Sequence, residues 1–217
     1  MSTTDILRQL SLLIGLPTLW IMGGAAAILV VARDWRLTVL GYAVMASMAG
    51  LLLCQVIPVE WALLQPIVGG LNAIVVFLSA RQLRWAGRDA ASWEVRWPQL
   101  ASVGSFRVLT VAVAVVAFFA LRDQVQLPKV SPLLRDAVVW LVMIGLLGIA
   151  LHEEPLHAGL SLLTVLVGFQ ILLFSLILDR LWIGLTHGGQ LLLGLAIAYL
   201  TVARGFATPV RGEGGRS

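Results

Sequence analysis

Seven apolar stretches, each long enough to cross a membrane, constrain this chain more than any other feature. A transmembrane helix needs about 20 mostly apolar residues to span a hydrocarbon core of about 30 Å. The stretches that meet this requirement are residues 11–32, 37–57, 60–80, 105–121, 133–151, 156–178 and 181–203. Because backbone polar groups in lipid must be paired within the segment, they predict an all-α, polytopic membrane protein of about seven transmembrane helices.

Composition excludes several other classes of protein. Apolar residues make up 59% of the chain and charged residues only 12%, about half the charged share of a soluble domain. The net charge of +4 does not predict nucleic-acid binding, because the basic residues are spread over loops and helix ends. The sequence has no glycine-rich phosphate loop, Cys/His metal cluster or G-x-S-x-G motif. We therefore expect no cofactor, no metal and no catalytic residue.

The basic residues predict how the chain is oriented in the bilayer. An outside N-terminus places ten Arg residues on the cytoplasmic side, namely Arg33, Arg36, Arg81, Arg84, Arg88, Arg96, Arg107, Arg204, Arg211 and Arg216. The outer side then holds five basic residues, namely Arg8, Arg122, Lys129, Arg135 and Arg180. The positive-inside rule favours this arrangement. We expect a multi-pass protein of a bacterial inner membrane, with its N-terminus outside and its C-terminus in the cytoplasm.

The spans group into two similar units with a crossover between them. The expected parts are a three-helix membrane unit in 1–104, a crossover helix and loop in 105–132, a three-helix module in 133–204 and a cytoplasmic tail in 205–217. In the connector 81–104, Arg alternates with Trp, which indicates an interfacial segment in contact with lipid headgroups. The first and last three spans run in the same directions, which suggests a parallel duplication.

Two glutamines lie deep inside the last two spans. The turn Asp179-Arg180 is so short that these spans must form an antiparallel hairpin. Gln170 and Gln190 both lie roughly 14 Å from that turn, at matching depth near the bilayer midplane. A carboxamide in hydrocarbon needs a partner, and each can offer the other a donor and an acceptor. We predict that they face each other as interhelical contacts or, alternatively, line a hydrated path.

Other residues nearby belong to the same prediction. His187 lies one turn outside Gln190 and completes a possible polar path with both glutamines. Small residues beside the glutamines are expected to let the helices pack closely; they are Gly168, Gly184, Gly188, Gly189 and Gly194.

The turn before the sixth span concentrates charge. It contains His152, Glu153, Glu154 and His157. A zinc-protease motif needs two histidines four residues apart on one helix, but these are five apart and Pro155 interrupts the helix. We expect a cytoplasmic cap that also offers a contact surface, and an intramembrane hydrolase is the third functional hypothesis.

The last three spans resemble a known family. "WLVMIGLLGIALHEEPLHAGLSLLTVLVGFQILLFSLIL" (140–178) followed by "GGQLLLGLAIAYLTVAR" (188–204) is similar to the K subunit of bacterial respiratory complex I. It also resembles the C subunit of Mrp-type sodium/proton antiporters. The shared pattern covers roughly 138–204, and the whole chain is similar to the E-type membrane subunit of complex I-related hydrogenases. The resemblance implies larger antiporter-type membrane subunits as partners.

The chain departs from that family at the positions that matter most for proton transfer. The resemblance places Gln170 and Gln190 where the family has glutamates. A buried carboxylate can take and release a proton, whereas a carboxamide cannot. We therefore expect a non-catalytic subunit of a complex I-like or Mrp-like proton- or cation-translocating assembly. The alternative is a stand-alone small transporter or channel.

Overall fold

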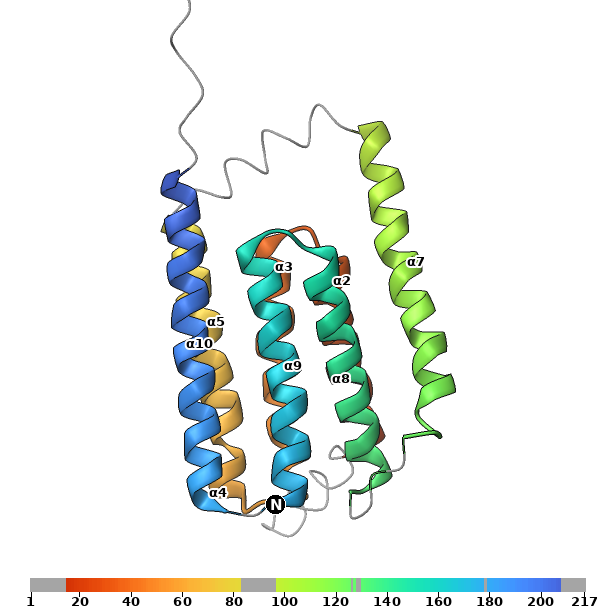
Figure 1. The fold of residues 1–217 in the computed structure, drawn as a ribbon, viewed down its shortest axis with the longest axis vertical. Coiled ribbons are helices and arrows are strands. Elements are labelled where there is room, and N and C mark those ends of the chain that lie inside the picture. The colour runs from red at the N-terminus through yellow and green to blue at the C-terminus, as the bar shows by residue number, and fades with distance from the viewer. Residues whose placement is uncertain (1–14, 83–96, 126, 128–129, 178, 208–217) are drawn as a thin grey trace, which may run out of the picture.

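The computed structural model describes residues 15–82, 97–125, 127, 130–177 and 179–207, and within these ranges every regular element is a helix. The helices are α2 (Leu16–Val31), α3 (Trp35–Leu53), α4 (Val59–Ala62), α5 (Leu64–Gln82), α7 (Trp97–Leu121), α8 (Pro132–Leu151), α9 (Pro155–Leu176) and α10 (Arg180–Ala207) (Figure 1). This confirms the predicted all-α class.

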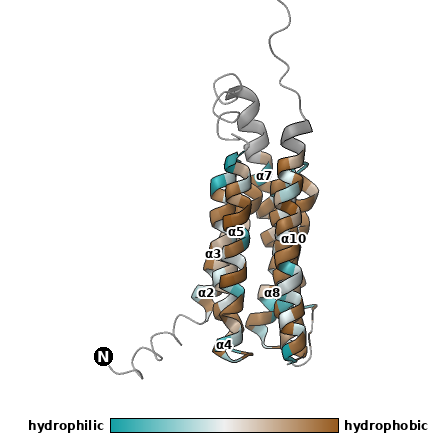
Figure 2. Cartoon of the chain, turned by 90° about the vertical axis from the view of Figure 1, so that its left-hand side faces the viewer, coloured by the Kyte–Doolittle hydropathy of each residue, from teal (hydrophilic) through white to brown (hydrophobic). Residues whose placement is uncertain are grey.

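Five segments are long and apolar enough to cross a bilayer: Trp35–Leu53, Val59–Gln82, Pro132–Leu151, Pro155–Leu176 and Arg180–Ala203. Leu16–Val31 and Phe106–Leu121 are shorter apolar helices, which brings the total close to the expected seven. The helices are apolar along most of their length (Figure 2). Many large apolar side chains, such as Trp20, Val116 and Leu192, are exposed on the bundle, as expected for a surface in lipid. The chain is a multi-pass membrane protein.

The helices form two three-helix layers that pack face to face. In Figure 1, α8, α9 and α10 lie in front of α2, α3 and α5. The packed pairs across the layers are α2 with α8, α3 with α9, and α5 with α10. One hydrogen bond connects the two layers: the indole N–H of Trp140 in α8 donates to the carbonyl of Gly23 in α2 at 3.1 Å. The division of the chain into two units, and their origin by duplication, stay predictions.

The crossover helix α7 lies at one edge of the layers, against α2 and α8. Phe118 on this helix packs edge-on against Trp140, with ring centroids 5.4 Å apart. The helix begins at Trp97, eight residues before the expected start of this span. The end of the predicted interfacial connector is therefore the first part of α7. The first two residues of that connector, 81–82, end α5. Residues 83–96 of the connector and 208–217 of the predicted tail lie outside the described residues.

Local sequence explains where the helices begin and how closely they pack. The side chain of Asp34 accepts from the backbone N–H of Arg36, at the start of α3. Ser131 caps α8 in the same way. Between α8 and α9, a Cβ on Gly148 would collide with the hydroxyl of Ser161. Glycine therefore permits the close approach of these two helices.

Candidate functional site

The two glutamines meet as predicted. The Nε2 of Gln170 in α9 donates to the Oε1 of Gln190 in α10 at 3.1 Å, and both side chains are fully buried. The short turn at Asp179 sets the register that brings them to the same depth. This confirms that they face each other, and the contact is direct.

Gln190 is the centre of a larger network. Its Nε2 donates to the hydroxyl of Tyr42 in α3 at 3.1 Å. The Nδ2 of Asn72 in α5 donates to the backbone carbonyl of Gln190, also at 3.1 Å. Tyr42 and Asn72 therefore each bond Gln190 from a different helix. The four side chains therefore connect α3, α5, α9 and α10, and they join the two three-helix layers in the interior.

Sequence reasoning missed Tyr42 and Asn72. Each is a polar residue inside an otherwise apolar span, which is the same signal that identified the glutamines. Their spans lie more than a hundred residues away from Gln190, and no short turn fixes their depth relative to it. The missing information was the packing of α5 against α10 and of α3 against α9.

The predicted glycines divide into two groups. Gly194 faces Asn72 so closely that a Cβ would overlap the carboxamide, and a Cβ on Gly168 would lie 3.1 Å from Leu141. Gly184, Gly188 and Gly189 meet nothing within 4 Å. The expectation of close packing was therefore wrong for these three, because they point away from the face of α10 that packs against the other helices.

His187 lies in the same interior region without joining the amide network directly. Its ring stacks on Phe174 of α9, with centroids 5.7 Å apart and planes at 13°. The Nδ1 lies 2.7 Å from the carbonyl of Ile183 and must donate to it, because a carbonyl oxygen only accepts. In the neutral ring, Nε2 is then an acceptor, and it has no partner among the described residues.

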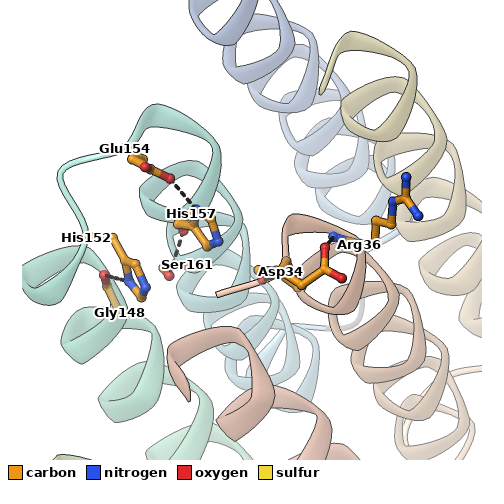
Figure 3. Close-up of polar contacts among 8 residues, drawn as sticks. Asp34, Arg36, Gly148, His152, Glu154, His157 and Ser161 are labelled. Atoms are coloured by element: carbon orange, nitrogen blue, oxygen red, sulfur yellow. Dashed lines mark hydrogen bonds and ion pairs between the residues drawn. The ribbon is translucent and has the colours of Figure 1, made fainter. Parts of the chain in front are cut away.

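In the polar turn between α8 and α9, the two histidines make the stabilising contacts (Figure 3). The rings of His152 and His157 stack with centroids 5.0 Å apart and planes at 9°. His152 donates from Nδ1 to the carbonyl of Gly148 at 2.9 Å. The Nδ1 of His157 lies 3.0 Å from a carboxylate oxygen of Glu154. This arrangement fits the predicted cap.

Exposure limits the predicted contact surface of this turn. His152 and His157 are 8% and 4% exposed, whereas Glu153 and Glu154 are exposed. A partner would therefore reach the carboxylates and not the rings. In Figure 3 the turn lies beside the α2–α3 loop at Asp34.

The surroundings shift two pKa values at this turn in the same direction. Burial lowers the pKa of His152, and the nearby charges of His157 and Arg107 lower it further, against the hydrogen bond that the ring donates to the Gly148 carbonyl. The hydrogen bond from His157 lowers the pKa of Glu154, and this outweighs its partial burial. Near neutral pH, His152 is uncharged and Glu154 is a carboxylate.

No metal-type cluster of three or more His, Cys, Asp or Glu side chains is present in the described part of the chain. Comparison with known proteins found no matching family model, no matching curated protein and no matching solved structure.

Proposed function

We propose that this chain is a non-catalytic membrane subunit of a complex I-like or Mrp-like proton- or cation-translocating assembly of a bacterial inner membrane. It would pack beside larger antiporter-type subunits and hold them in register. The observation that carries the proposal is the amide network, in which Gln170 and Gln190 are bonded to each other.

The chemistry of that network favours a structural role. Gln170, Gln190, Asn72 and Tyr42 are neutral at physiological pH, and carboxamides cannot take up and release protons. Their bonds link four helices in the interior of the bundle. Such a network fixes which helices pair and at what depth, while contributing little stability, about 0.6 kcal/mol per interhelical bond. A subunit that keeps the family's shape without its carboxylates would serve as a scaffold.

The alternative is a stand-alone small transporter. The observation that favours it is the unpartnered Nε2 of His187, since histidine can exchange protons near neutral pH. The amide network opposes it, because Gln190 is already bonded to Tyr42 and Asn72, whose side chains are neutral.

Reconstitution of the purified chain in liposomes separates the two functions. Under a proton or sodium gradient, the scaffold role predicts no flux above that of empty liposomes. Gln170→Ala should impair assembly with partner subunits and not ion binding by this chain. Robust flux from the chain alone, abolished by His187→Ala or Gln190→Ala, would refute the scaffold and establish the transporter.

A further inference from the structure

Three buried side chains between α5, α9 and α10 have polar atoms without a hydrogen-bond partner in the described residues. They are both carboxamide atoms of Gln65, the Oε1 of Gln170 and the Nε2 of His187. Gln65 and Gln170 are fully buried, and His187 is 4% exposed. Buried polar groups in folded proteins are almost always paired with protein or with ordered water. Several unpaired ones in one region therefore indicate a bound polar ligand.

The helix register places Gln65 near the amide network. Gln65 and Asn72 are seven residues apart, which puts them on the same face of α5 and about 10 Å apart along it. Asn72 reaches Gln190 of α10. Because α5 and α10 pack together along this face, Gln65 points into the same interior region, nearer the end of the molecule that carries α4.

His187 and Gln170 border that region from the other two helices. His187 is three residues before Gln190 on α10, on the side toward the beginning of that helix. Its ring stacks on Phe174, which is one turn from Gln170 on α9. All the unpaired atoms therefore lie at the network or between it and the α4 end.

Beyond the network the interior face of α5 is apolar. The buried residues after Asn72 on this helix are Ala73, Val76 and Ala80. The buried hydroxyls farther along α9 and α10 (Ser161, Thr164 and Thr201) each donate to a backbone carbonyl of their own helix. The unpaired atoms on the α4 side of the network therefore favour entry of water from that end.

We propose that the seam between α5, α9 and α10 binds a column of ordered water, which enters at the α4 end and stops at the amide network. Gln65 offers water both donors and an acceptor, whereas His187 Nε2 and Gln170 Oε1 are acceptors. The Nδ1 bond to Ile183 holds the His187 ring so that Nε2 remains available to a water O–H. This water site does not depend on whether the chain is a subunit or a transporter.

Thiol labelling of the full-length protein in native vesicles tests the column. All variants carry Cys54→Ala, because Cys54 is the one native thiol. Glu60→Cys, on the exposed start of α4, identifies the compartment at that end. Gln65→Cys should react with a small membrane-impermeant thiosulfonate from that same compartment. Val76→Cys, fully buried beyond the network, should react at least about tenfold more slowly, because a thiol in apolar surroundings stays protonated and inert.

Two labelling results would overturn the proposal. One is an unreactive Gln65→Cys beside a reactive Glu60→Cys; the other is equal reactivity of Gln65→Cys and Val76→Cys.

Gln65→Leu provides a second test that needs no cysteine at this position. In a dry seam, removing an unpaired carboxamide raises the melting temperature Tm. A hydrated seam predicts an unchanged or lower Tm, and a rise would contradict it.

Discussion

Gln170 donates a hydrogen bond to Gln190, but the two partners are not equivalent. Gln170 has this one hydrogen bond from its side chain, whereas the side chain of Gln190 also bonds Tyr42 and its carbonyl accepts from Asn72. The contact between α9 and α10 is thus one branch of a network centred on α10. The difference leads to an ordered set of mutational effects.

Replacing Gln190 should be more damaging than replacing Gln170. Gln190→Leu leaves both Gln170 and Tyr42 without this partner, at a cost of about 1–3 kcal/mol for buried polar groups. Gln170→Leu leaves only the Oε1 of Gln190 unpaired. We expect Tm in detergent to fall more for Gln190→Leu, and little for Gln82→Leu at the exposed end of α5. In the double mutant, a coupling energy of about 0.6 kcal/mol is expected between the glutamines. Additive effects of the two substitutions would show that their hydrogen bond contributes nothing.

Glycine substitutions on α10 should have opposite effects. Gly194→Ala places a methyl group against the carboxamide of Asn72, and overpacking of this kind costs about 1–3 kcal/mol. Gly188→Ala meets open space and should be neutral, or stabilising by up to about 1 kcal/mol through helix propensity. Thermal unfolding of both variants measures the difference. Equal tolerance of both would mean that Asn72 does not approach α10 this closely.

The general fold could be predicted from the sequence because lipid imposes a simple rule on it. Apolar runs of sufficient length must be helices, and prolines and charges mark the turns between them. The residues at which the helices begin and end were less predictable. For example, the start of α7 at Trp97 was not predicted. Nothing in the Arg/Trp pattern distinguishes an interfacial segment from the first turns of a long helix. The pairing of α5 with α10 depends on side-chain packing between distant segments, which hydropathy does not encode.

The candidate site was predictable only where local geometry fixed it. The Asp179-Arg180 turn set the register of Gln170 and Gln190, so their contact followed from counting residues. Tyr42 and Asn72 entered the network through tertiary packing. The outward direction of Gly184 was also missed, because every face of α10 is apolar enough to be ambiguous between lipid and protein.

The positive-inside prediction of orientation can be checked at two exposed positions. Glu153→Cys in the α8–α9 turn should be cytoplasmic, and Asp179→Cys in the α9–α10 turn should face outward. In a Cys54→Ala background, an impermeant maleimide added to intact spheroplasts should label Asp179→Cys and leave Glu153→Cys unlabelled until the membrane is permeabilised. The reverse pattern would invert the assigned topology.

Acid should destabilise the α8–α9 turn. The pKa of His152 is lowered below 6.5 by burial, and that of Glu154 below 4.5 by its bond to His157. A folded-state pKa below the unfolded value means stability that is present above the unfolded pKa and lost as pH falls through the folded pKa. Tm should therefore start to fall below about pH 6.5, through His152, and continue below about pH 4.5, through Glu154.

Glu154→Gln isolates the carboxylate part of this pH dependence. The variant should keep the first fall in Tm, which comes from His152, and lose part of the second. Glu60→Gln, at the opposite end of the molecule, serves as the matched substitution. A wild-type Tm that is flat from pH 7.5 to about pH 4 would contradict the assignment of the neutral His152 and charged Glu154.

Purification of the native chain in a mild detergent, with identification of the proteins that co-migrate with it, tests the proposed function most directly. The scaffold role predicts a single large complex in which this chain is present together with antiporter-type membrane subunits. Gln190→Leu should reduce the amount of that complex. A chain that migrates alone from its native membrane, at the size of a monomer or small homo-oligomer, would contradict the account.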